Sequence, residues 1–200
     1  MPCEIAPASL VHGDMQTLAV ILRSSVAFAI VSTAAFAVWV FGGSWFHLHG
    51  GETAMYAACC LVFLLLAGLL LRPALRWPGG LLRFYGFFLP AFLLYALAWC
   101  AAWFSLGAGR GEWIASLAGS MAFTIVMAAA LRGWRAWPVA TLAVFIGHSA
   151  GYFAGEQVCY RSLHSTASEL AWGLLYGIGF GAGIGCAYTA MQRSWTQASS

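Results

Sequence analysis

The stretch TAMYAACCLVFLLLAGLLL, residues 53–71, decides the fold class of this chain because it holds no charged side chain. A membrane-spanning helix needs about 20 mostly apolar residues to cross roughly 30 Å of hydrocarbon. Five further stretches have this character, at 17–41, 84–106, 112–131, 138–155 and 169–191. We therefore predict an all-α fold, a polytopic transmembrane bundle of six helices.

The composition of the 200 residues excludes several classes of protein. Apolar residues make up 62% of the chain and charged residues 8%, against roughly 45–50% and about 25% in soluble domains. An ordinary soluble domain and a disordered chain are therefore both excluded. Lysine is absent, which excludes a retinal Schiff base. The net charge of +3 comes without a basic cluster, so no nucleic-acid partner is expected.

The placement of arginine predicts the orientation of the six spans. With the N-terminus inside, seven of the nine arginines flank cytoplasmic ends, and Arg110 and Arg161 alone lie outside. Cytoplasmic segments carry such an excess of basic residues. We expect a cytoplasmic segment at 1–16, a transmembrane domain at 17–191 and a cytoplasmic tail at 192–200, all in a cell inner membrane. Residues 1–16 hold no lysine or arginine, so the first span, whether the chain starts at Met1 or Met15, is expected to be retained.

A shift of 60 residues aligns the second span with the fourth. It matches Gly51-Glu52 with Gly111-Glu112, Leu71-Arg72 with Leu131-Arg132 and Trp77-Pro78 with Trp137-Pro138. This internal repeat suggests a duplicated helical hairpin. Such repeats occur in many transporters, whose substrate sites lie near the repeat interface, and they also occur as purely structural hairpins.

Glycine recurs every four residues on the last two spans. The two stripes, a glycine-zipper pattern, are Gly147, Gly151 and Gly155, and Gly173, Gly177, Gly181 and Gly185. Small residues at this spacing allow helix backbones to approach closely in a membrane. We expect the fifth span to pack on the sixth, or the stripes to pair copies in a homo-oligomer. Gly179 and Gly183 leave the opposite side of the sixth span without side chains at two positions, and a second helix or a flat cofactor could lie there.

One ionisable residue, His148, lies deep within a predicted span. Polar residues at that depth are costly and often functional. On the fourth span Glu112, Ser116, Ser120 and Thr124 follow at i, i+4 spacing, so they share one helix face that could lead to the histidine. The plain interpretation is a neutral imidazole that is hydrogen-bonded to a serine or a carbonyl. The active alternatives are proton relay, solute coordination and axial ligation of haem.

The remaining ionisable groups gather in the loops expected to lie outside. His47, His49 and Glu52 have ligand types that suit zinc, copper or iron, and His164 could complete the set if the loops fold together. The sequence Gly147-His148-Ser149-Ala150-Gly151 matches G-x-S-x-G. That motif works on a strand-to-helix turn, so inside a membrane helix we interpret it as coincidence.

Three functions are compatible with these sequence features. The leading hypothesis is transport of a small solute, proton or metal ion through the helical core, with His148 at its centre. The second is a non-catalytic subunit of a larger membrane complex that holds a pigment or cofactor, and the third is a membrane enzyme with an outer metal site. The sequence leaves the cofactor unknown. Expected partners are the lipid bilayer and either further copies of the chain or other membrane subunits.

Overall fold

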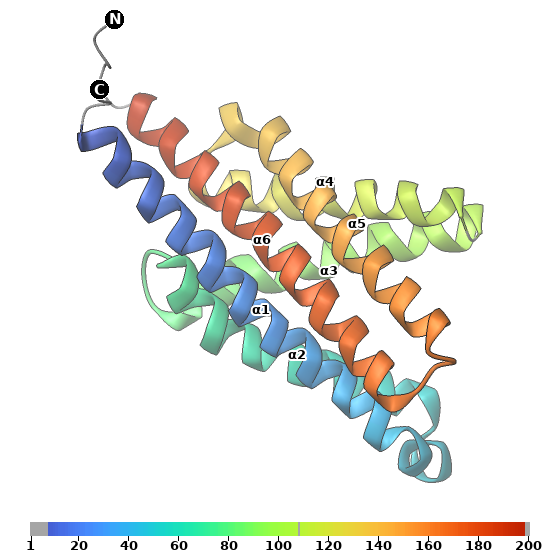
Figure 1. Cartoon of the computed structure of the whole chain (residues 1–200). Coiled ribbons are helices and arrows are strands. Elements are labelled where there is room, and N and C mark those ends of the chain that lie inside the picture. The colour runs from blue at the N-terminus through green and yellow to red at the C-terminus, as the bar shows by residue number, and fades with distance from the viewer. Residues whose placement is uncertain (1–7, 108, 199–200) are drawn as a thin grey trace, which may run out of the picture.

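The structure is a computed structural model that describes residues 8–107 and 109–198, with side chains described from Asp14 to Ser194. The described part is helical and contains no strand. Its elements are α1 (Ala8–His49), α2 (Gly51–Leu75), α3 (Leu81–Leu106), α4 (Arg110–Leu131), the short 3-10 helix η1 (Trp134–Ala136), α5 (Trp137–Arg161) and α6 (Thr166–Ala198). Each predicted span falls within one α-helix, and consecutive helices are joined by short turns (Figure 1).

Five helical segments are long and apolar enough to cross a membrane: Asp14–His49, Gly51–Leu75, Leu81–Leu106, Arg110–Leu131 and Thr166–Ser194. The chain is therefore a multi-pass membrane protein of the helical-bundle class. Helix α5 is not among the five, although it has 25 residues. Its glycines and the polar residues His148 and Ser149 make it less apolar than its neighbours. The crossing of the membrane by α5 stays a prediction.

Helix α6 lies between α1 and α5 (Figure 1), and its packing against each is extensive. The other close pairs are the hairpins α1–α2 and α3–α4, whereas α2 and α3 touch at few places. The α3–α4 hairpin is inclined to the other helices in this view. The two hairpins are therefore in limited contact where α2 meets α3.

Glycines on two faces of α6 allow this central position. The stripe Gly173, Gly177, Gly181 and Gly185 faces α1, where a Cβ on Gly177 would lie 2.5 Å from the Cα of Ala29. The opposite side, Gly179 and Gly183, contacts α5 at Gly147 and Val144. Gly151 and Gly155 of α5 also lie against the α6 backbone, at Tyr176 and Trp172. The α5 stripe thus packs on α6, while the four-residue α6 stripe packs on α1.

Apart from Arg23, which lies within α1, the charged residues of the described part separate to the two ends of the bundle. The arginine end comprises the start of α1, the α2–α3 and α4–α5 turns and the end of α6, with Arg72, Arg76, Arg83, Arg132, Arg135 and Arg193. Arg193 joins the first and last helices there, at 2.6 Å from Thr17 Oγ1 and 3.5 Å from Asp14 Oδ1. The opposite end, called the His/Glu end, holds His47, His49, Glu52, Arg110, Glu112, Glu156, Arg161, His164 and Glu169.

The residues aligned by the 60-residue shift have different structural roles. Arg132 caps the end of α4 in the left-handed conformation, with φ 55°, whereas Arg72 lies inside α2. Arg76, with φ 52°, is the residue that ends α2. Trp77 is buried and stacks on Phe87 at 4.2 Å, while Trp137 opens α5. The internal repeat therefore remains a hypothesis from the sequence.

Candidate functional site

His148 of α5 is buried at the centre of the bundle, with 1% of its surface exposed. Its Nδ1 lies 2.5 Å from Ser116 Oγ of α4, and its Nε2 lies 2.5 Å from the Tyr95 hydroxyl of α3. A neutral imidazole has one donor and one acceptor nitrogen, so these two contacts use both. Axial ligation of haem by His148 would require that one of them be broken.

The hydrogen bonds continue in both directions from the histidine. Ser116 Oγ lies 2.7 Å from Ser149 Oγ, and the Tyr95 hydroxyl lies 3.3 Å from the Tyr176 hydroxyl of α6. The five residues Ser149, Ser116, His148, Tyr95 and Tyr176, here called the His148 network, join four helices. Every member can both donate and accept a hydrogen bond, so the network is internally satisfied without a charge.

Aromatic rings fix the orientation of the imidazole. Tyr176 and Phe180 meet it edge to face, at 5.3 Å and 5.2 Å between ring centroids. Tyr152, one turn along α5, lies parallel to it at 6.0 Å. Such arrangements of rings are the ones favoured by the aromatic quadrupole, and they leave the histidine a single packed position.

Of the polar stripe predicted on the fourth span, only Ser116 reaches His148. Ser120 donates to the Ser116 carbonyl at 2.7 Å, and Thr124 donates to the Ser120 carbonyl at 2.8 Å. Thr124 also pairs with Thr141 of α5 at 2.7 Å. Glu112 lies at the helix start, where its carboxylate accepts from the Gly109 amide at 3.2 Å. The stripe lies on one buried face, but its deeper hydroxyls are engaged in bonds within and between helices.

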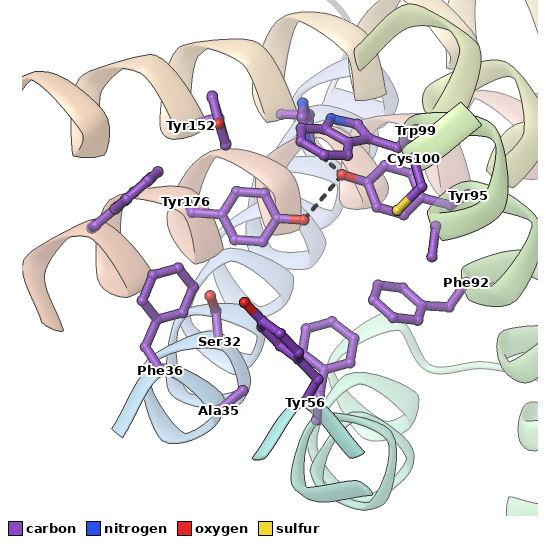
Figure 2. Close-up of a pocket in the computed structure, with 14 residues that line it drawn as sticks. Ser32, Ala35, Phe36, Tyr56, Phe92, Tyr95, Trp99, Cys100, Tyr152 and Tyr176 are labelled. Atoms are coloured by element: carbon purple, nitrogen blue, oxygen red, sulfur yellow. Dashed lines mark hydrogen bonds between the residues drawn. The ribbon is translucent and has the colours of Figure 1, made fainter. Parts of the chain in front are cut away.

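A cavity of about 450 Å³ lies beside the His148 network (Figure 2). Five helices line it, α1, α2, α3, α5 and α6, in the half of the bundle toward the His/Glu end. Its wall is mostly aromatic, formed by Phe36, Tyr56, Phe63, Phe92, Tyr95, Trp99, Tyr152, Trp172 and Tyr176. His148, Ser32, Ala35, Ala96 and Cys100 complete the lining. Tyr56 and Cys100 are exposed, so the cavity reaches the surface between α2 and α3.

Two residues that line the cavity each carry a polar atom without a hydrogen-bond partner among the described residues. These atoms are Ser32 Oγ and Trp172 Nε1, and both are buried. In Figure 2 the Ser32 oxygen points into the space between Tyr56 and Tyr176. A buried polar group without a partner costs about 1–3 kcal/mol, so a ligand acceptor that reached either atom would be stabilised.

Two carboxyl groups lie near each other at the His/Glu end. Glu156 follows the predicted span 138–155 on α5, and Glu112 begins the fourth span. Burial raises the pKa of the Glu156 carboxyl above its ordinary value, and the neighbouring Glu112 carboxylate raises it further. A proton on Glu156 is therefore held more tightly than on an isolated carboxyl.

The structure does not gather the residues considered for a metal site. His47, His49, Glu52 and His164 are all exposed. His49 Nδ1 lies 2.8 Å from the Trp45 carbonyl, and His164 Nδ1 lies 3.2 Å from Cys159 Sγ. Among the described residues, no three histidine, cysteine, aspartate or glutamate side chains lie together as ligands would. The cysteines of that part of the chain are all free thiols.

Ser149 lies inside α5 and is buried, with its hydroxyl on Ser116. It is not on an exposed turn of the kind that activates the serine of G-x-S-x-G hydrolases. Neither Ser149 nor Ser116 lines the cavity, whereas His148 and its partner Tyr95 both do.

Sequence reasoning missed Tyr95, Tyr176, Ser32 and Trp172. A signal was present for the two tyrosines, because each places a hydroxyl inside an otherwise apolar span. A buried tyrosine usually finds a partner for that hydroxyl.

Comparison of the chain with protein-family models, curated proteins and solved structures gives no match.

Proposed function

We propose that the chain transports a small, uncharged, largely apolar solute across the membrane and that the aromatic cavity is its binding site. The observation that carries this proposal is the cavity of about 450 Å³ that ends on the His148 network. Ligand sites are concave, mostly apolar and of this size, with a few polar groups that set orientation. Here the hydroxyls of Tyr95 and Tyr176 provide those groups, and His148 positions the Tyr95 hydroxyl.

The same geometry favours an uncharged solute over a proton or a metal ion. Beyond His148, toward the arginine end, the hydroxyls of Ser120 and Thr124 bond to their own helix. No described carboxylate or guanidinium lines the cavity, and an unpaired charge would be costly there. The proposal thus keeps His148 as the centre of transport and makes its role the positioning of the Tyr95 hydroxyl at the cavity.

The cavity is closed toward the arginine end by rings of the core. Tyr95 packs on Phe180 at 5.1 Å, and Phe180 packs on Phe123 at 5.9 Å. Phe123 and Phe180 are fully buried. Transport therefore requires a second state in which these rings separate and the cavity opens to the other side, as in alternating access.

Single cysteines in a cysteine-free background test this requirement. Ala96 lines the cavity on α3, whereas its neighbour Leu97 is 58% exposed on the outer surface of the same helix. In vesicles of both orientations, we expect a membrane-impermeant thiol reagent to label Ala96→Cys from either side. Leu97→Cys, at the same depth but facing lipid, should stay unlabelled. Labelling of Ala96→Cys from one side only, or from neither, would refute transport.

A second function is favoured by the aromatic wall, which could also hold a resident pigment or cofactor in a subunit of a larger complex. All five lining helices contribute aromatic rings to this wall. Such a subunit would show one-sided labelling of Ala96→Cys, because it needs no second state. The purified protein would also show visible absorption, and replacement of Ala96 by phenylalanine should remove that absorption by filling the cavity.

A further inference from the structure

We propose that the solute is a neutral, planar molecule with carbonyl oxygens, of the quinone class; this inference names the substrate of the function proposed above and rests on it. The chemistry of the cavity wall specifies three properties of the ligand: its charge, its shape and the kind of hydrogen bond that it accepts.

The ligand is neutral because the cavity offers no partner for a charge. Among the described residues that line it, none carries a carboxylate or a guanidinium. Its one imidazole already has a hydrogen-bond partner at each nitrogen. Moving an isolated ion into such surroundings costs far more than hydrogen bonds with the wall would return.

The ligand is planar because rings form the wall. Phe63 and Phe92 stack at 4.4 Å on the side of α2 and α3, and Phe36 and Trp172 lie 5.9 Å apart on the side of α1 and α6. Flat aromatic faces gain most from a flat partner that stacks on them or meets them with its edge.

The ligand carries acceptor oxygens because the unsatisfied groups of the wall are donors. An indole nitrogen can only donate, and Trp172 Nε1 is buried without a partner in the described structure. Ser32, 1% exposed, has an equally unpartnered hydroxyl that points into the cavity (Figure 2). A carbonyl-bearing ring can accept from both groups.

Two further buried atoms without a partner supply matched controls. Thr33 Oγ1 follows Ser32 on α1 but lines a separate groove, and Trp137 Nε1 lies at the start of α5 near the arginine end. Neither residue lines the aromatic cavity. Substitution at these sites removes the same kind of group without changing the cavity.

Calorimetry of the purified full chain in detergent, with duroquinone as the probe, tests the inference. Duroquinone is a neutral quinone without a ring hydrogen, so cysteines cannot add to it; durene has the same ring and methyl groups but no oxygen. We expect duroquinone to bind and durene to bind at least ten times more weakly. Ser32→Ala and Trp172→Phe should each weaken duroquinone binding about 2- to 10-fold, the value of one hydrogen bond. Thr33→Ala and Trp137→Phe should leave the affinity unchanged.

Equal binding of durene and duroquinone would overturn the inference, since the cavity would then select only for an apolar shape. Absence of duroquinone binding would overturn it as well. Two-sided labelling of Ala96→Cys together with absent duroquinone binding would reject the quinone class and leave transport standing. One-sided labelling with duroquinone binding would reject transport and leave the ligand class standing. The ligand comparison uses the unmodified chain, so it does not depend on the folding of a variant.

Discussion

At the scale of single residues, the central feature is an imidazole buried in a membrane bundle with both nitrogens bonded. His148 is held by Ser116 on one side and by Tyr95 on the other. A buried polar group with its partners contributes modestly to stability, whereas the loss of one partner leaves an unsatisfied atom that costs about 1–3 kcal/mol. The stability of the bundle should therefore respond strongly to the hydroxyl of Tyr95.

Tyr95→Phe tests this dependence, because it removes that hydroxyl and keeps the ring. We expect the free energy of unfolding to fall by about 1–3 kcal/mol, seen as a lower melting temperature in detergent. Tyr85→Phe is the matched control, since the Tyr85 hydroxyl donates to the Leu65 carbonyl at 2.8 Å in an exposed position. If both variants melt at the same temperature, the His148 network is not a stabilising unit.

Part of this site could be predicted from single residues, and part could not. The depth of His148 follows from the length of its apolar stretch, and Ser116 follows from the i, i+4 spacing on α4. Tyr95 and Tyr176 were not predicted, because hydropathy does not determine which face of a span turns inward. That choice depends on how α3 inclines and on which side of α6 packs against α5, and both depend on contacts between helices.

At the scale of helices, glycine determines how closely α6 approaches its neighbours. Lipid gives helices no hydrophobic reason to associate, so close backbone contact carries much of the packing energy. At Gly177, a methyl group would meet the Cα of Ala29 at 2.5 Å and the Phe28 carbonyl at 2.7 Å. These are backbone atoms, which cannot move aside as the end of a flexible side chain can.

Gly177→Ala is therefore expected to force α6 away from α1 and to lower the melting temperature or abolish folding. Gly86→Ala is the control, because Gly86 lies within α3 with open space where its methyl group would stand. Alanine favours a helix over glycine by about 1 kcal/mol, so this variant should melt at the same temperature or higher. Equal melting temperatures for Gly177→Ala and Gly86→Ala would contradict close packing of α6 on α1.

The helix ends show what hydropathy can and cannot locate. The apolar stretch 53–71 marks where the chain is soluble in lipid, yet α2 continues past Pro73 to Leu75. Its end is set by the left-handed conformation of Arg76, whose amide bonds back to the Pro73 carbonyl at 3.1 Å. Apolar character predicts the membrane-spanning part of a helix, while capping determines where the helix stops.

At the scale of the whole molecule, most of the arginines lie at the same end of the bundle as the start of α1 and the end of α6. The start of α1 and the end of α6 lie together at the arginine end, joined by Arg193. Helix α5 has 25 residues, which span about 37 Å, and it runs beside α6 between the two charged ends (Figure 1). Its exposed side carries Val139, Leu142 and Ile146, whereas its polar residues His148 and Ser149 face inward.

Reporter fusions test whether α5 crosses the membrane and which side holds the arginine end. With six crossings, a fluorescent protein fused after Ser194 should fluoresce in the cytoplasm, and alkaline phosphatase fused after Ser165 should be active outside. If α5 did not cross, the residues on either side of it would share one compartment. Ser165 would then lie in the cytoplasm and Ser194 outside, so the phosphatase would be inactive and the fluorescent protein dark. Phosphatase fused after Gly107, between α3 and α4, should be active in either case and serves as the control. Since arginine is concentrated at the end that holds the start of α1 and the end of α6, an outside location for that end would contradict the rule that places basic residues in the cytoplasm. The orientation inferred from charge and the six-helix crossing inferred from packing are thus tested by the same fusions, and each can fail alone.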